Sequence, residues 1–194
     1  MLSKYQVRKQ CRVPTSRVST EINFLLRPCL RFIFQSFNTS IFCYHSVPDT
    51  NASVELYIHD CAGSSIFNQV EMNAKYWENA SAVMIVYDIT SQESLQSCSK
   101  WLQQIQASKN GGPKFIGVLV GNKCDHRDGA IDTRAEVIQD DAATFGKQLD
   151  LEYFETSAAT NTKVDEPFQY IATEFYKRYV ETVAKAEELA ANVV

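Results

Sequence analysis

The sequence contains no glycine before residue 63, and all seven of its glycines lie from there onward. A loop that wraps backbone N–H groups around a phosphate needs glycine to curl tightly, so the first third of the chain lacks this device. No apolar stretch approaches the roughly 20 residues of a membrane-spanning helix. No cysteine pair has the C-x-x-C spacing of a metal or redox site, which indicates reduced thiols. The last cysteine is Cys124, so we expect no prenyl group and no lipid anchor.

Charge divides the chain into two unlike parts. Residues 1–47 hold seven Lys or Arg and one acidic residue, whereas residues 48–194 hold twelve basic and twenty-two acidic residues. The overall net charge of −4 argues against a nucleic-acid-binding protein. We interpret residues 1–46 as an atypical basic segment that is either disordered or not the native amino terminus. A short strand at 30–34 and an Arg-rich, acid-poor mitochondrial presequence are alternative interpretations of this segment.

Beyond residue 46 the apolar pattern becomes regular. At 194 residues and 45% hydrophobic content the chain can bury the core of one domain. Apolar runs predict strands at 54–58, 82–87, 115–121 and 151–154, and helical spacing predicts helices at 65–79, 92–107, 133–148 and 164–190. This alternation predicts an α/β fold, with a mostly parallel sheet and helices on both faces, over residues 47–180. Residues 181–194 are predicted to form a C-terminal helical extension.

The strongest motif follows the apolar run at 115–121, where Asn122, Lys123 and Asp125 form Asn-Lys-x-Asp. The carboxyl ends of strands are where open α/β sheets bind ligands. A carboxylate can accept hydrogen bonds from N1–H and the 2-amino group of guanine, while an amide reaches N7 and a lysine stem lies along the base. Adenine would leave the carboxylate unpaired, at a cost of about 1–3 kcal/mol. The motif also arises by chance in surface turns, but its place after a buried strand favours a guanine site.

Two more predicted strands end in polar residues. Asp60 begins Asp-x-x-Gly, which ends at Gly63, and Ser157-Ala158 follows the strand at 151–154. Asp60 could hold Mg²⁺ through water, and Gly63 lets a backbone N–H approach a terminal phosphate. The N–H of Ala158 could meet guanine O6. Either polar residue taken singly also suits a helix cap or a turn.

With these three motifs in order, the chain resembles the small GTPases of the Ras superfamily, and Rab-like members in particular. The stretches SVELYIHDCAG, IVYDITSQES, GVLVGNKCD and YFETS resemble the Rab-like GTPases of the intraflagellar transport B complex. The resemblance implies a P-loop-NTPase-like small G domain that binds GTP or GDP with Mg²⁺. It also implies a role in cilium assembly and ciliary cargo trafficking, a location in cytoplasm and cilium, and a small β-sandwich partner subunit within the transport B complex.

The amino-terminal segment departs from this family. Small GTPases carry Gly-x-x-x-x-Gly-Lys-[Ser/Thr] after their first strand, but the corresponding window at 11–20 has no glycine and no lysine. Ser64 stands where many members carry a glutamine that orients the attacking water. We therefore expect a sheet that is incomplete at its amino terminus, and weak or absent GTP hydrolysis. A nucleotide-free pseudo-GTPase interaction module, a conventional Rab-type trafficking GTPase and, more remotely, a mitochondrial protein are the alternatives.

Overall fold

The computed structural model describes residues 19–26, 40–60, 80–109, 114–127 and 134–192. Its strands form one sheet in the order β2-β3-β1-β4-β5-β6, and only the β2–β3 pair is antiparallel. The strands are β1 (Ser19–Leu26), β2 (Ser40–Ser46), β3 (Ser53–Asp60), β4 (Ala82–Asp88), β5 (Ile116–Asn122) and β6 (Glu152–Thr156). The predicted α/β fold with a mostly parallel sheet is therefore confirmed.

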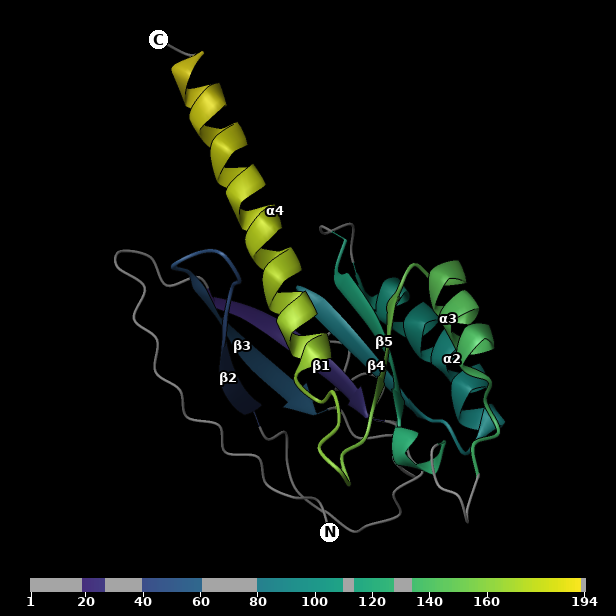
Figure 1. Ribbon diagram of the computed structural model, residues 1–194. Coiled ribbons are helices and arrows are strands. Elements are labelled where there is room, and N and C mark those ends of the chain that lie inside the picture. Colours follow the sequence, from purple (N-terminus) through teal and green to yellow (C-terminus); the bar gives the residue numbers. More distant parts are fainter. Residues whose placement is uncertain (1–18, 27–39, 61–79, 110–113, 128–133, 193–194) are drawn as a thin grey trace.

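Helices cover both faces of this sheet, as Figure 1 shows. α2 (Gln92–Ser108) and α3 (Gln139–Gln148) lie on one face, and α4 (Glu166–Ala191) lies on the other. Every residue of β4 is buried, because alternate side chains face opposite helix layers. Val83 and Ile85 pack with α2, whereas Met84 and Val86 pack with Ile171 and other residues of the α4 layer. Burial on both faces explains the uninterrupted apolar run in the sequence.

The amino-terminal part of the chain supplies the central strand of the sheet. β1 fills the place between β3 and β4, pairing in parallel with both; Ile22 lies opposite Ile58 on one side and Ala82 on the other. β2 also precedes residue 47 and pairs with β3, so the sheet begins earlier in the chain than the predicted boundary. β1 thus covers one edge of β3 and one edge of β4 that would otherwise be exposed, and exposed strand edges promote aggregation. The alternative strand at 30–34 and the predicted helix at 65–79 lie outside the described residues.

Two helix boundaries depend on particular contacts. α2 begins after Ser91, whose hydroxyl accepts a hydrogen bond from Ser94 N at 3.2 Å and caps the helix. α3 begins at Gln139, later than the predicted residue 133, because Glu136 and Val137 donate their N–H groups to Ile89 O. α4 runs to Ala191, and its residues from Glu181 onward are exposed, so the predicted C-terminal extension is helical. Within the described residues, no helix has the length and hydropathy of a membrane span.

Candidate functional site

The carboxyl ends of β4, β5 and β6 lie side by side at one edge of the sheet. Asp88 is paired in register with Asn122, and Asn122 is paired with Thr156. The loops that leave these strands carry Lys123 and Asp125 after β5, and Ser157 and Ala158 after β6. Five of the predicted site residues therefore lie close together, although about 30 residues of sequence separate the group after β5 from the group after β6.

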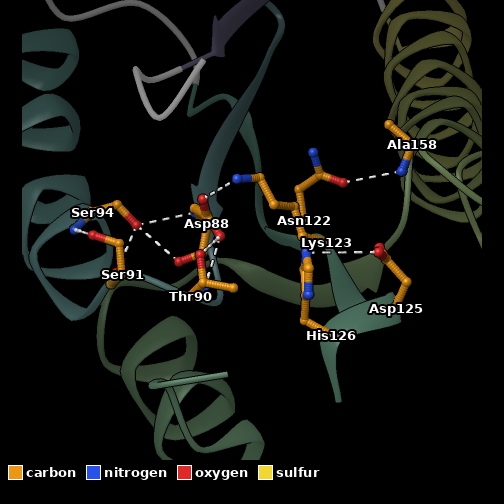
Figure 2. Close-up of polar contacts among 9 residues, drawn as sticks. All are labelled: Asp88, Thr90, Ser91, Ser94, Asn122, Lys123, Asp125, His126 and Ala158. Atoms are coloured by element: carbon orange, nitrogen blue, oxygen red, sulfur yellow. Dashed lines mark hydrogen bonds and ion pairs between the residues drawn. The ribbon is translucent and has the colours of Figure 1, made fainter. Parts of the chain in front are cut away.

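Asn122 holds the two loops together. Its Oδ1 accepts a hydrogen bond from Ala158 N at 3.2 Å (Figure 2). It also accepts a longer hydrogen bond from Thr156 Oγ1 at 3.5 Å. The N–H of Ala158, expected to face guanine O6, is thus engaged with Asn122, and a base bound here would share that donor. The amide nitrogen of Asn122 has no hydrogen bond within the part of the chain described, which leaves it able to donate to a ligand.

Asp125 lies in the 3₁₀ turn η1 (Cys124–His126) directly after β5. Its Oδ1 accepts a hydrogen bond from Ser157 Oγ at 2.5 Å. The other oxygen, Oδ2, lies 3.8 Å from His126 Nε2. Ser157 is fully buried, and its hydroxyl also accepts from Thr160 N at 3.1 Å. The Ser157 hydroxyl thus donates one hydrogen bond and accepts another within the protein. Ser157 therefore orients Asp125, and the Asp125 carboxylate is the group that can contact a ligand.

Lys123 has a left-handed backbone, with φ 73° and ψ 35°, which turns the chain out of β5. Its ammonium group reaches Asp88 Oδ2 at 2.5 Å (Figure 2). The other carboxylate oxygen, Oδ1, accepts from Thr90 N at 2.9 Å and from Thr90 Oγ1 at 2.7 Å. Burial opposes ionisation of Asp88, but the hydrogen bonds from Lys123 and Thr90 outweigh it and hold the pKa of this carboxyl below its usual range. Lys123 is therefore held by a buried, ionised partner.

Asp88 is a site residue that the sequence interpretation missed. It follows the buried run at 82–87, and a polar residue directly after a buried strand is the same signal that identified Asn122. Arg127 and Glu155 were missed too, because nothing in their spacing links two residues separated by 27 others. The structure joins them by hydrogen bonds from Arg127 Nε to both carboxylate oxygens, at 3.0 and 2.8 Å.

The remaining predicted residues are less completely placed. Asp60 is the last residue of β3, where it pairs in register with Phe24 of β1. Asp60 thus lies at the same edge of the sheet as Asn122, with β1 and β4 between their strands. Gly63 and Ser64 lie outside the described residues. Among the residues described, no three His, Cys, Asp or Glu side chains are grouped to hold a metal ion.

The arrangement suits recognition of a planar, polar ligand. A carboxylate oxygen of Asp125, the amide nitrogen of Asn122 and the stem of Lys123 come from the end of β5 and the loop after it, and hydrogen bonds with the loop after β6 support them. A carboxylate that accepts from two adjacent N–H groups distinguishes guanine from adenine, which offers none at these positions. Hydrogen bonds to a charged group contribute about 1.5–3 kcal/mol each, enough to select one base.

Comparison with known proteins identifies the family. A model described as "Ras family" matches residues 30–188. The intraflagellar transport protein 27 homologues of Mus musculus and Homo sapiens are both 40% identical, covering 71% and 74% of this chain and 69% and 73% of theirs. Intraflagellar transport protein 27 of Chlamydomonas reinhardtii is 34% identical over 76% of this chain and 70% of its own. A Ras-related protein Rab5 from Nicotiana tabacum is 34% identical, over 79% of this chain and 72% of its own. The chain therefore belongs to the Ras family of small GTPases, as a Rab-like member similar to the intraflagellar transport 27 proteins.

Proposed function

We propose that this chain is a guanine-nucleotide-binding subunit of the intraflagellar transport machinery. The observation that carries the nucleotide part is the meeting of Asn122, Lys123 and Asp125 with Ser157 and Ala158 at the carboxyl ends of β5 and β6. The transport part rests on similarity to the intraflagellar transport 27 proteins. Ras-family membership in general implies GTP or GDP with Mg²⁺.

The residues present fit the base of the nucleotide. Asp125 accepts from N1–H and the 2-amino group, Asn122 donates from its amide nitrogen to N7, and Lys123 lies along the base plane. Ser157 fixes the rotamer of Asp125, and the Ala158 amide lies near O6. No reaction takes place at the base, so these residues only select the base and orient it.

The residues present do not fit the phosphates in the same way. No glycine occurs among residues 1–62, and no lysine in that stretch is followed by Ser or Thr. Contacts to the base alone correspond to about −4 kcal/mol, a millimolar dissociation constant, whereas nanomolar binding needs about −12 kcal/mol. We therefore propose weak nucleotide binding and weak or absent hydrolysis for this sequence. Asp60 and Gly63 would serve Mg²⁺ and the terminal phosphate only if a phosphate-binding loop were supplied.

A titration with nucleosides tests the base half directly, because nucleosides need no phosphate cradle. NMR chemical shifts should show guanosine binding with a dissociation constant of about a millimolar, and adenosine binding more weakly. The variant Asp125→Asn should lose guanosine and gain xanthosine, because the new amide donates where the carboxylate accepted. Equal binding of guanosine and adenosine by the wild type would reject guanine recognition and favour a nucleotide-free interaction module.

The cellular half needs a separate test. Endogenous tagging in ciliated cells should place the protein in cytoplasm and cilium, and purification should recover the transport B complex, including a small β-sandwich subunit. The alternative, a conventional Rab-type trafficking GTPase, predicts internal membranes without transport B subunits. Its basis is the similarity to Rab5 of Nicotiana tabacum. Localisation therefore separates the two proposals even if nucleotide binding is equal in both.

A further inference from the structure

We propose that the ion pair between Arg127 and Glu155 positions Asp125 for base recognition and so sets the selectivity of the site for guanine. The inference rests on the proposed guanine-binding function. Arg127 lies two residues after Asp125, and Glu155 lies two residues before Ser157. The pair therefore joins the two loops at the point where one supplies the carboxylate and the other supplies the hydroxyl that orients it.

The geometry of the pair fixes direction as well as distance. Arg127 Nε donates to Glu155 Oε1 at 3.0 Å and to Oε2 at 2.8 Å, and Arg127 Nη2 donates to Oε1 at 2.5 Å. A planar guanidinium that contacts both oxygens of a carboxylate allows little rotation of either group. The side chains of Arg127 and Glu155 are 20% and 10% exposed, so water has little access to the pair.

Arg127 also holds a third segment. Its Nη1 donates to Val137 O at 2.7 Å. Glu136 and Val137 in turn donate their N–H groups to Ile89 O, at 2.9 and 3.0 Å. One guanidinium thus connects the loop after β5, the end of β6 and the segment before α3, and that segment is in turn bonded to the residue after β4.

Glu155 is also held by Tyr153, which in turn contacts Tyr87. Tyr153 Oη donates to Glu155 Oε1 at 2.5 Å, and the hydroxyls of Tyr153 and Tyr87 lie 3.1 Å apart. Burial, followed by the hydrogen bond to Glu155, raises the pKa of Tyr153, so its hydroxyl remains a donor. Tyr87, in β4, is fully buried. Glu155 is therefore restrained by Tyr153 independently of Arg127, which limits how far the pair can shift with the loop.

A buried ion pair is a weak source of stability, because desolvation offsets much of the attraction. Its effect on geometry is a better reason to expect a role at this position. Two hydrogen bonds from adjacent N–H groups of one base require the Asp125 carboxylate to stay in the base plane. Loosening the loop would weaken the second bond first, and this loss appears as lower selectivity between bases.

The test compares guanosine with inosine, which lacks the 2-amino group and so offers Asp125 only N1–H. The wild type should prefer guanosine by about tenfold, the equivalent of about 1.4 kcal/mol. Arg127→Gln and Glu155→Gln should each reduce this ratio toward one, and Arg127→Lys should retain part of it. A loss of folded protein would lower the apparent affinity for both nucleosides equally, so the ratio separates positioning from stability.

Lys114→Gln serves as the matched control. This variant removes the ion pair between Lys114 and Asp150, which lies at the other end of β5. The two side chains are 70% and 67% exposed. The guanosine-to-inosine ratio should not change. If Arg127→Gln fails to fold, Glu155→Gln gives the result, because it preserves the size of the side chain and an acceptor for Tyr153. A wild-type ratio in a folded variant would overturn this inference alone. A wild type that binds neither nucleoside would overturn the proposed function and the inference with it.

Discussion

Lys123 Nζ lies 2.5 Å from Asp88 Oδ2, and this ion pair joins the loop after β5 to the end of β4. Only 7% of the Asp88 side chain is exposed, against 30% of the Lys123 side chain. Lys123→Met should therefore lower the free energy of unfolding by about 3 kcal/mol, because it leaves a buried carboxylate without its partner. Urea denaturation at pH 7 measures this loss.

Asp88→Asn supplies the comparison, since it removes the charge while keeping an acceptor for Thr90. The double variant Lys123→Met/Asp88→Asn should be more stable than Lys123→Met alone. Because the pKa of Asp88 is lowered, its stabilisation is present above the unfolded-state pKa of about 3.9 and is lost as pH falls through the lower folded-state value. The wild type should thus lose its advantage over Lys123→Met in acid. Strictly additive losses at pH 7 would contradict the pairing.

Sequence patterns identified what depends on local chemistry. β4 and β5 were predicted because both faces are buried and their residues form unbroken apolar runs, and Asn122 and Asp125 were found because they follow such a run. β1 was missed because its place is set by pairing with Ile58 and Ala82, residues far along the chain, and its surroundings in the sequence are strongly basic. The part played by Ser157 was missed for the same reason, since it depends on a contact across 32 residues.

Gly121 lies in β5 directly against Tyr87. A Cβ atom at this position would come within 2.7 Å of Tyr87 Oη and 3.0 Å of Ile89 Cγ2. Both neighbours are fully buried, so close packing limits how far they can move aside. Gly121→Ala should destabilise the fold by about 1–3 kcal/mol, as overpacking does elsewhere, and thermal unfolding followed by circular dichroism would measure it.

Tyr87→Phe tests the cause of that loss. It removes the hydroxyl that makes the shortest contact, although ring atom Cζ would still lie 2.9 Å from the added Cβ. The double variant should therefore lose less stability than the sum of the two single variants. Additive losses would show that the strain arises elsewhere.

Cys43 should react slowly with alkylating agents. Burial, followed by the negative charge of Asp165, raises the pKa of its thiol to about 11. At pH 8 only about one thiol in a thousand is then ionised, and the thiolate is the reactive form. Chymotryptic peptide mapping after brief iodoacetamide treatment should find Cys43 far less modified in the native protein than in urea. Asp165→Asn should speed the reaction, and equal native and unfolded rates would contradict the burial.

His45 should make stability depend on pH between neutral and mildly acidic conditions. Its ring stacks on Phe168, with centroids 5.8 Å apart and planes 7° apart. Burial lowers its pKa, and the opposing effects of Asp165 and Gln169 only partly offset this. The unfolded chain, with a histidine pKa of about 6.5, therefore binds the proton more readily, so stability is full above that pH and falls as pH decreases.

The matched variant is His45→Phe, which keeps a flat ring against Phe168 and cannot take up a proton. Urea denaturation at pH 7.5 and 5.5 should show the wild type losing more stability than the variant over this interval. The difference between the two proteins isolates His45, because every other titrating group is common to both. Parallel losses would mean that the His45 ring is as accessible to protons in the folded chain as in the unfolded one, and that its stacking against α4 does not restrict its ionisation.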